Sequence, residues 1–129
     1  MPYPPNSGTR IRAYYLLQHL AQRGAVTLLH YTRSDAESAQ AEFLRPFCEH
    51  IIGIPLCRSR VVDMLTLVRS LLVRTPFFIM RDDSASMRRA VSALTKKTGF
   101  DVVHADQLNM AQFARLARGA ARVVDNHNV

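Results

Sequence analysis

Apolar residues recur along this chain at two alternating spacings. In five segments they lie three and four positions apart, which is the spacing of one face of an α-helix. Between these segments lie short runs rich in Val, Ile and Leu, a pattern typical of buried strands. The predicted helices span residues 9–23, 35–47, 60–73, 83–97 and 107–117. The predicted strands span residues 26–31, 51–54, 101–105 and 122–126.

Helices that alternate with short apolar strands predict a parallel sheet with right-handed crossovers. The expected fold class is therefore α/β, a Rossmann-like parallel sheet with helices on both faces, and residues 1–129 are expected to form part of one domain. The Pro-rich segment at residues 4–8 is typical of a loop between a strand and a helix, yet no strand precedes it. We therefore expect that the first strand is missing and that the domain is truncated at both ends.

Four predicted helices have one clear inward face. The side chains expected to face the core are Ala13, Leu16, Leu17 and Leu20; Ala36, Ala39, Phe43 and Phe47; Met87, Ala90, Val91 and Leu94; and Met110, Phe113, Ala114 and Ala117. The helix over residues 60–73 is the most apolar and is surrounded by Arg58, Arg60, Arg69 and Arg74. Two interpretations remain open for it: a core helix with solvated arginines, or a surface helix that contacts anionic lipid.

The composition, 48% hydrophobic and 21% charged, is that of a globular protein. No apolar run reaches the roughly 18 residues of a membrane span, and the Pro-rich start does not resemble a signal peptide. We expect a cytoplasmic protein, peripheral at the inner membrane face if the Arg-rich helix contacts lipid. Cys48 and Cys57 are expected to be reduced thiols, and with His50 they lack the fourth ligand of a metal site.

The net charge of +7, from 17 Lys and Arg against 10 Asp and Glu, suits an anionic partner. Such a partner could carry sugar-nucleotide phosphates, lipid head groups or nucleic acid. Solvated arginines explain the charge equally well. Charge alone therefore leaves the partner open.

Two kinds of segment could carry chemistry. The first is the turn at Ser7, Gly8 and Thr9, which leads into a helix whose unpaired N–H groups attract phosphate. Gly8 would let a ligand approach the backbone, and Arg10 follows in the first turn. The GxGxxG dinucleotide fingerprint is absent. An ordinary turn capped by Asn6 or Ser7 is the alternative.

The second kind lies at the carboxyl ends of the last two predicted strands, where open α/β sheets bind ligands. After the final strand, His127 could donate a hydrogen bond or move a proton, and Asp125 could orient it. After the preceding strand come Asp106 and Gln107. Asp106 could cap the next helix, contact a ligand, or do both.

Four segments in order, YPPNSGTRIRAY (residues 3–14), GAVTLL (24–29), FDVVH (100–104) and VVDNHNV (123–129), resemble the N-terminal domain of family 4 glycosyltransferases of the GT-B fold. The resemblance is closest to bacterial members associated with exopolysaccharide or other surface-glycan synthesis. It implies two Rossmann-like domains that face across a cleft. The N-terminal one receives a glycan or lipid-linked acceptor, and the C-terminal one holds a nucleotide-sugar donor, with no bound metal ion or other cofactor.

The resemblance also implies roles for single residues. The loop of Ser7, Gly8, Thr9 and Arg10 would face the donor phosphate and sugar, and His127 would be the catalytic residue that lines the donor sugar. The residues assigned to the acceptor side are Asp106, Gln107, Asp125 and Asn128. This chain lacks the paired-glutamate donor domain, so it is expected to be inactive by itself.

Two other classes compete with this interpretation. A basic α/β module that binds nucleic acid or another anion needs cations interleaved with exposed aromatics. The aromatic residues here fall largely on predicted apolar faces, so no nucleic-acid partner is expected. A flavodoxin-like nucleotide or receiver domain needs acidic residues at its early strand ends, and the Pro-rich start lacks them.

Overall fold

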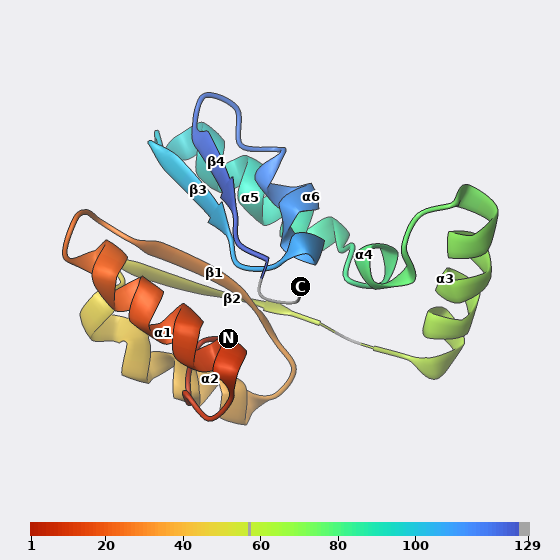
Figure 1. The fold of residues 1–129 in the computed structure, drawn as a ribbon, viewed down its shortest axis with the longest axis horizontal. Helices are drawn as coiled ribbons and strands as arrows, with labels where there is room; N and C mark the ends of the chain where they lie inside the picture. The colour runs from red at the N-terminus through yellow and green to blue at the C-terminus, as the bar shows by residue number, and fades with distance from the viewer. Residues whose placement is uncertain (57, 127–129) are drawn as a thin grey trace. The chain divides into compact units, whose positions relative to one another are not determined.

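A computed structural model describes residues 1–56 and 58–126 of the chain. The protein is α/β, and its chain divides into two compact units, Met1–Cys57 and Arg58–Val129. Each unit contains one pair of parallel strands with its own helices, as Figure 1 shows.

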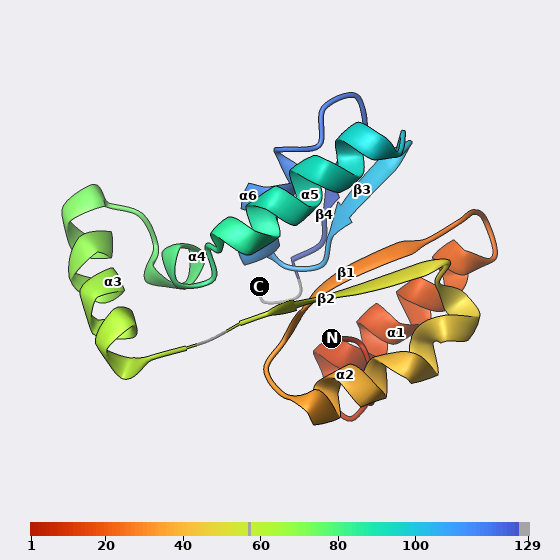
Figure 2. The ribbon, with the colours of Figure 1, turned by 180° about the vertical axis from the view of Figure 1, so that it is seen from behind.

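The first unit alternates helices and strands in the order α1 (Gly8–Ala21), β1 (Thr27–Thr32), α2 (Asp35–Ala41), the 3₁₀ helix η1 (Glu42–Phe47) and β2 (His50–Pro55). β1 and β2 pair in parallel, with Leu28 opposite Ile51. These two side chains pack against a core of Leu17, Leu44 and Cys48. The core of this unit therefore lies between α1, η1 and one face of the strand pair (Figure 2).

The helix predicted over residues 35–47 changes type in its middle. Its α-helical part ends at Ala41, and η1 continues with Pro46 inside it. The ring of Pro46 would clash with the carbonyl four residues earlier in an α-helix, which disfavours continued α geometry here. The inward face turns accordingly: Ala41 and Leu44 are buried, whereas Phe43 is 61% exposed.

The inward face predicted for this helix was therefore wrong. Ala36 and Ala39 are exposed, as Phe43 is, and only Phe47 packs against the core. Phe43 instead stacks on Tyr3, with 4.8 Å between the ring centroids. In α1 the prediction was confirmed for Ala13 and Leu17, which are buried.

The second unit begins with three helices, α3 (Arg60–Val73), α4 (Phe77–Arg81) and α5 (Ala85–Lys97). They are followed by β3 (Val102–Ala105), the 3₁₀ helix η2 (Leu108–Met110), α6 (Ala111–Ala114) and β4 (Ala121–Val124). The buried apolar side chains here include Met87, Phe113, Ala114 and Ala117, which were predicted to face inward, and Ala105 of β3 is buried as well. The Ser84 hydroxyl accepts a hydrogen bond from the Met87 N–H and caps α5.

Parallel strands were predicted and are confirmed. β3 pairs with β4 in parallel, from Val102 opposite Ala121 to Ala105 opposite Val124. The hydrogen bonds form two two-stranded sheets, β1–β2 and β3–β4. The short helix α4 was not predicted, and the helix predicted over residues 107–117 is reduced to η2, α6 and turns. No helix in the described ranges is both long enough and apolar enough to cross a membrane.

The helix α3 has the predicted bounds but not the burial of a core helix. Ser70 is its one buried residue. Its large apolar side chains are exposed, from 42% at Leu67 to 80% at Leu72. The core interpretation of this helix was therefore wrong. The helix ends at Arg74, which adopts the left-handed conformation with φ 54° and ψ 36°.

Candidate functional site

The start of α1 is a helix N-terminus without a side-chain cap. Ser7 occupies the N-cap position in an extended conformation, and its carbonyl accepts a hydrogen bond from the Ile11 N–H at 2.8 Å. Its hydroxyl makes no capping hydrogen bond, and no acidic residue lies in the first turn. The helices α2 and α5 are capped by Ser34 and Ser84, whereas α3 and α4, like α1, begin without a side-chain cap. The positive end of the α1 dipole is therefore left available to an anion.

Gly8 opens α1 on the exposed surface. A Cβ at this position would meet no atom within 4 Å, and the backbone of Gly8 is not in the positive-φ region. Folding therefore does not require glycine here, and what glycine provides is access to the backbone from outside. Arg10 Nη1 donates to Asn6 Oδ1 at 3.2 Å, so Asn6 positions Arg10 rather than capping the helix. Thr9 is half-buried beside them.

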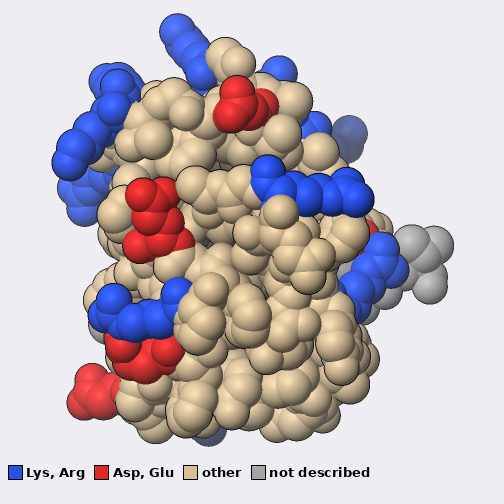
Figure 3. All heavy atoms as spheres, turned by 90° about the vertical axis from the view of Figure 1, so that its left-hand side faces the viewer, with Lys and Arg blue, Asp and Glu red and all other residues tan. Residues whose placement is uncertain are grey.

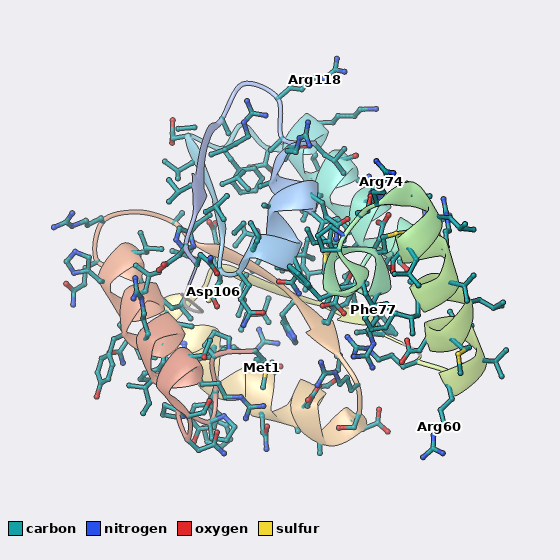
Figure 4. The ribbon with its side chains drawn as sticks, turned by 45° about the vertical axis from the view of Figure 1, so that its right-hand side comes forward. Met1, Arg60, Arg74, Phe77, Asp106 and Arg118 are labelled. Atoms are coloured by element: carbon teal, nitrogen blue, oxygen red, sulfur yellow. The ribbon has the colours of Figure 1, made fainter. Side chains whose placement is uncertain are left out.

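The carboxyl ends of β3 and β4 bring two predicted site residues together. Ala105 lies opposite Val124, and the Asp125 N–H donates to the Ala105 carbonyl at 2.9 Å. Asp106 and Asp125 are the next residues of their strands, so both half-buried aspartates stand at one edge of this pair. Figure 4 labels Asp106 at the end of β3.

Gln107, not Asp106, is the N-cap of η2, and its carbonyl accepts from the Met110 N–H at 2.9 Å. The interpretation of Asp106 as the helix cap was therefore wrong. His127 and Asn128 lie outside the described residues. The roles expected of Gly8 and His127 at the donor sugar stay predictions.

A polar cluster that the sequence did not reveal holds η2 in place. Asn109 Nδ2 donates to Asp82 Oδ2 at 2.5 Å, and Arg58 forms an ion pair with the same aspartate. Gln112 Nε2 donates to the carbonyls of Ile79 and Asn109, both at 2.9 Å. The cluster ties η2 and α6 to the end of α4. It thereby positions the turn of Asp106 and Gln107, which directly precedes η2.

A shallow hollow of about 500 Å³ lies on α5 of the second unit. Its lining residues are Arg88, Arg89, Ser92, Ala93, Lys96 and Leu116. The Arg88 guanidinium donates to both Asp83 oxygens, at 2.6 and 2.8 Å, so part of its charge is already balanced. On the face drawn in Figure 3, Lys and Arg side chains stand in separate groups, with Asp and Glu side chains beside some of them. This hollow would attract a small anion rather than an extended one.

Burial is the main cause of a pKa shift at two described side chains of the first unit, Cys48 and His30. Burial raises the pKa of the Cys48 thiol, which keeps it protonated. Burial also lowers the pKa of His30, although its Nδ1 lies 3.0 Å from the Tyr31 carbonyl, a contact that acts in the opposite direction. In the part of the chain that the structure describes, no three His, Cys, Asp or Glu residues are arranged to hold a metal ion.

Neither a family model, nor a curated protein, nor a solved structure matches this chain. Its function is therefore inferred from its own residues and their placement.

Proposed function

We propose that this chain is the acceptor-side, N-terminal part of a GT-B glycosyltransferase. The intact enzyme transfers a sugar from a nucleotide-sugar donor to a glycan or lipid-linked acceptor, in bacterial exopolysaccharide or surface-glycan synthesis. One observation carries the proposal: Asp106 and Asp125 meet at the carboxyl ends of two parallel strands, and His127 follows Asp125 two positions later. This edge is where open α/β sheets bind ligands.

In the proposed fold the two strand pairs belong to one Rossmann-like sheet with helices on both faces. Both pairs are parallel, and each second strand follows a helical segment, as right-handed crossovers require. A further strand joins them in this proposal, because each pair offers edges at which a strand can be added.

The chemistry assigns different tasks to the two ends of the site. The acceptor hydroxyl attacks the anomeric carbon of the donor sugar, the bond from that carbon to the phosphate oxygen breaks, and the hydroxyl proton passes to the leaving phosphate oxygen. Asp106 and Asp125 hold acceptor hydroxyls by accepting their hydrogen bonds. His127 donates to the donor sugar, and the uncapped start of α1 with Arg10 stabilises the negative charge on the leaving phosphate.

The test uses the polypeptide that contains both this chain and a donor-binding domain. Sugar transfer from nucleotide-sugar donors is measured for Asp106→Asn, Asp125→Asn and His127→Ala. We expect His127→Ala to lower turnover by about 100-fold or more, while acceptor binding changes little. The aspartate variants are expected to raise the acceptor KM.

The matched control is Asp101→Asn. Asp101 precedes β3 at its amino end, and its carbonyl accepts the Ala121 N–H at 2.8 Å, a bond that the substitution preserves. The control removes the same charge from the opposite end of the same strand, so it should leave transfer unchanged. Absence of nucleotide-sugar turnover in the intact protein, or equal losses in Asp101→Asn and Asp106→Asn, would reject the proposal.

A second candidate is a basic α/β module that binds an anion without catalysis, which the three cations around the α5 hollow favour. It predicts that pyrophosphate binds the chain alone and that Arg89→Gln with Lys96→Gln abolishes this binding. Calorimetric titration with pyrophosphate distinguishes the candidates, because the glycosyltransferase site does not use these two side chains.

A further inference from the structure

The helix α3 buries part of its polar side and exposes its apolar side, the reverse of the usual arrangement. A surface helix normally turns its apolar stripe inward and its polar side to water. In α3 the inward side is polar: Ser70 is buried, and Asp63 accepts two hydrogen bonds from Arg81 of α4. Thr66, also on this side, donates its hydroxyl to the Val62 carbonyl at 2.7 Å.

The outward side of α3 is a continuous apolar stripe. It consists of Val61, Met64, Leu65, Val68, Leu71 and Leu72, each more than half exposed. At about 100° per residue these six side chains fall within roughly one third of the helix circumference. Scattered apolar side chains on a surface are ordinary, but a contiguous stripe marks a place where something binds.

Arginines border this stripe on both sides. Arg60 and Arg69 lie about half a turn apart around the helix axis, one on each border, and Arg74 lies at the end. All three are exposed, and among the described residues no ion pair or hydrogen bond of their guanidinium groups is found. Figure 4 shows Arg60 and Arg74 at opposite ends of α3. The acid of the helix, Asp63, faces the other way and is paired with Arg81. The outward side therefore carries positive charge without any negative charge.

We propose that α3 docks on an anionic phospholipid surface. The apolar stripe enters the boundary between head groups and acyl chains, and Arg60, Arg69 and Arg74 contact lipid phosphates. Their aliphatic stems lie along the apolar layer while the guanidinium groups stay at the head groups. A helix of 14 residues is about 21 Å long, too short to span a bilayer, so it lies in the plane of the surface.

The charges favour lipid over a second copy of the chain. Two α3 stripes packed face to face would bring Arg-bordered edges against each other, with no acidic residue on either stripe to balance them. An anionic lipid surface balances these charges and covers the stripe at the same time. This inference does not depend on the proposed glycosyl transfer.

The test is cosedimentation of the whole chain with vesicles, either of phosphatidylcholine alone or of equal parts phosphatidylcholine and phosphatidylglycerol. We expect binding to the anionic vesicles at low salt and weaker binding at high salt. Leu71→Gln with Leu72→Gln should lower the partition coefficient by more than about tenfold. Arg60→Gln with Arg69→Gln should lower it by about 25-fold, from about fivefold per arginine near the surface.

Matched controls remove the same groups elsewhere. Ile11→Gln replaces a 42% exposed apolar residue on α1, and Arg118→Gln removes an exposed arginine outside α3, which Figure 4 labels. Ile11→Gln should leave vesicle binding unchanged, and Arg118→Gln should change it less than either Arg60→Gln or Arg69→Gln. All substituted side chains are exposed, so the variants should fold.

A second readout uses the absence of tryptophan from the sequence. Val68→Trp places a single fluorescent tryptophan side chain in the middle of the stripe. Val102→Trp places one at the exposed first position of β3. With anionic vesicles, the emission of Val68→Trp should shift to shorter wavelength and be quenched by brominated lipid, whereas that of Val102→Trp should not.

Three results would overturn the proposal. The first is no binding to anionic vesicles at low salt. The second is binding that Leu71→Gln with Leu72→Gln leaves unchanged. The third is a concentration-dependent dimer that these two substitutions abolish in a chain that does not bind vesicles, which would assign the stripe to a second copy.

Discussion

Arg81 of α4 donates two hydrogen bonds to one carboxylate oxygen of Asp63 on α3, from Nη2 at 2.8 Å and from Nε at 3.2 Å. Such partly exposed pairs contribute little to the stability of most proteins. Here the pair joins the polar side of α3 to α4, and α3 buries little else. The contact therefore fixes the position of α3 on α4 and contributes little to the free energy of unfolding.

Asp63→Asn should loosen α3 without unfolding the unit. We expect faster backbone hydrogen exchange in α3, with little change in α5 or β3, because local opening follows the number of buried contacts. The matched control is Glu42→Gln, which breaks an exposed pair with Arg45 in η1. Equal exchange rates in α3 for Asp63→Asn and the unchanged chain would show that other contacts hold this helix.

Gly53→Ala should destabilise the first unit. A Cβ at Gly53 would lie 2.5 Å from the buried Thr32 Oγ1, which is attached to the stiff, β-branched part of its side chain. We expect a loss of about 1–3 kcal/mol in urea unfolding, as for other overpacked sites.

The control and the rescue for this substitution come from the same chain. Gly24→Ala, whose Cβ would meet nothing within 4 Å, should leave the free energy of unfolding nearly unchanged. Thr32→Ala removes the crowded hydroxyl, which has no hydrogen-bond partner among the described residues, and should recover much of the loss in the double variant. An unchanged midpoint for Gly53→Ala alone would contradict the prediction.

The stability of the fold should fall as the pH drops below about 6.5, the pKa of an unperturbed histidine. Burial lowers the pKa of His30, so the unfolded chain binds a proton more readily than the folded one. Stability is therefore complete above the unfolded pKa of about 6.5 and declines as the pH falls toward the folded value. The midpoint of thermal unfolding, measured from about pH 7.5 to about pH 5, checks this decline, because histidine titrates in that range.

His30→Gln should flatten this pH dependence, whatever its effect on the midpoint at neutral pH. His19→Gln, at an exposed position of α1, should preserve the decline. If His30→Gln retains the full slope, another group is responsible for it.

Gly8→Ala separates folding from sugar transfer. The added Cβ meets no atom and replaces glycine by a better helix former, so the free energy of unfolding should rise by at most about 1 kcal/mol. In the proposed glycosyltransferase, however, the methyl group would occupy the path of the donor phosphate to the N–H groups of α1. We expect reduced transfer with preserved stability, and Gly99→Ala, equally unobstructed, should change neither. Normal transfer by Gly8→Ala would remove this loop from the site.

The sequence predicted the features that depend on local pattern. The bounds of α3 followed from its apolar run, and the helix predicted over residues 83–97 is α5, which begins two residues later than predicted. Asp106 and Asp125 were predicted to follow the last two strands, and the parallel pairing of those strands brings the two residues to one edge. These features depend on spacing within a few residues or on a general rule of strand connection.

Two features could not be obtained in this way. Periodicity reveals that α3 has an apolar face, but it does not reveal whether that face meets the core or the surroundings. The hydrogen bond between Asp82 and Asn109 joins residues 27 positions apart, and their sequence spacing carries no sign of it. The change of helix type at Pro46 is partly predictable. The proline can be read from the sequence, but its effect on which side chains face inward cannot.

The left-handed conformation of Arg74 sets selection for stability against selection for vesicle binding at this position. Glycine adopts φ near 54° freely, whereas a side chain there costs about 1–2 kcal/mol. A mutational screen scored on thermal stability should therefore enrich Arg74→Gly. The same library scored on retention at anionic vesicles should deplete it, because the charge at the end of α3 is lost. Opposite rankings of one substitution in the two screens would make position 74 a site where folding and binding are under opposing selection.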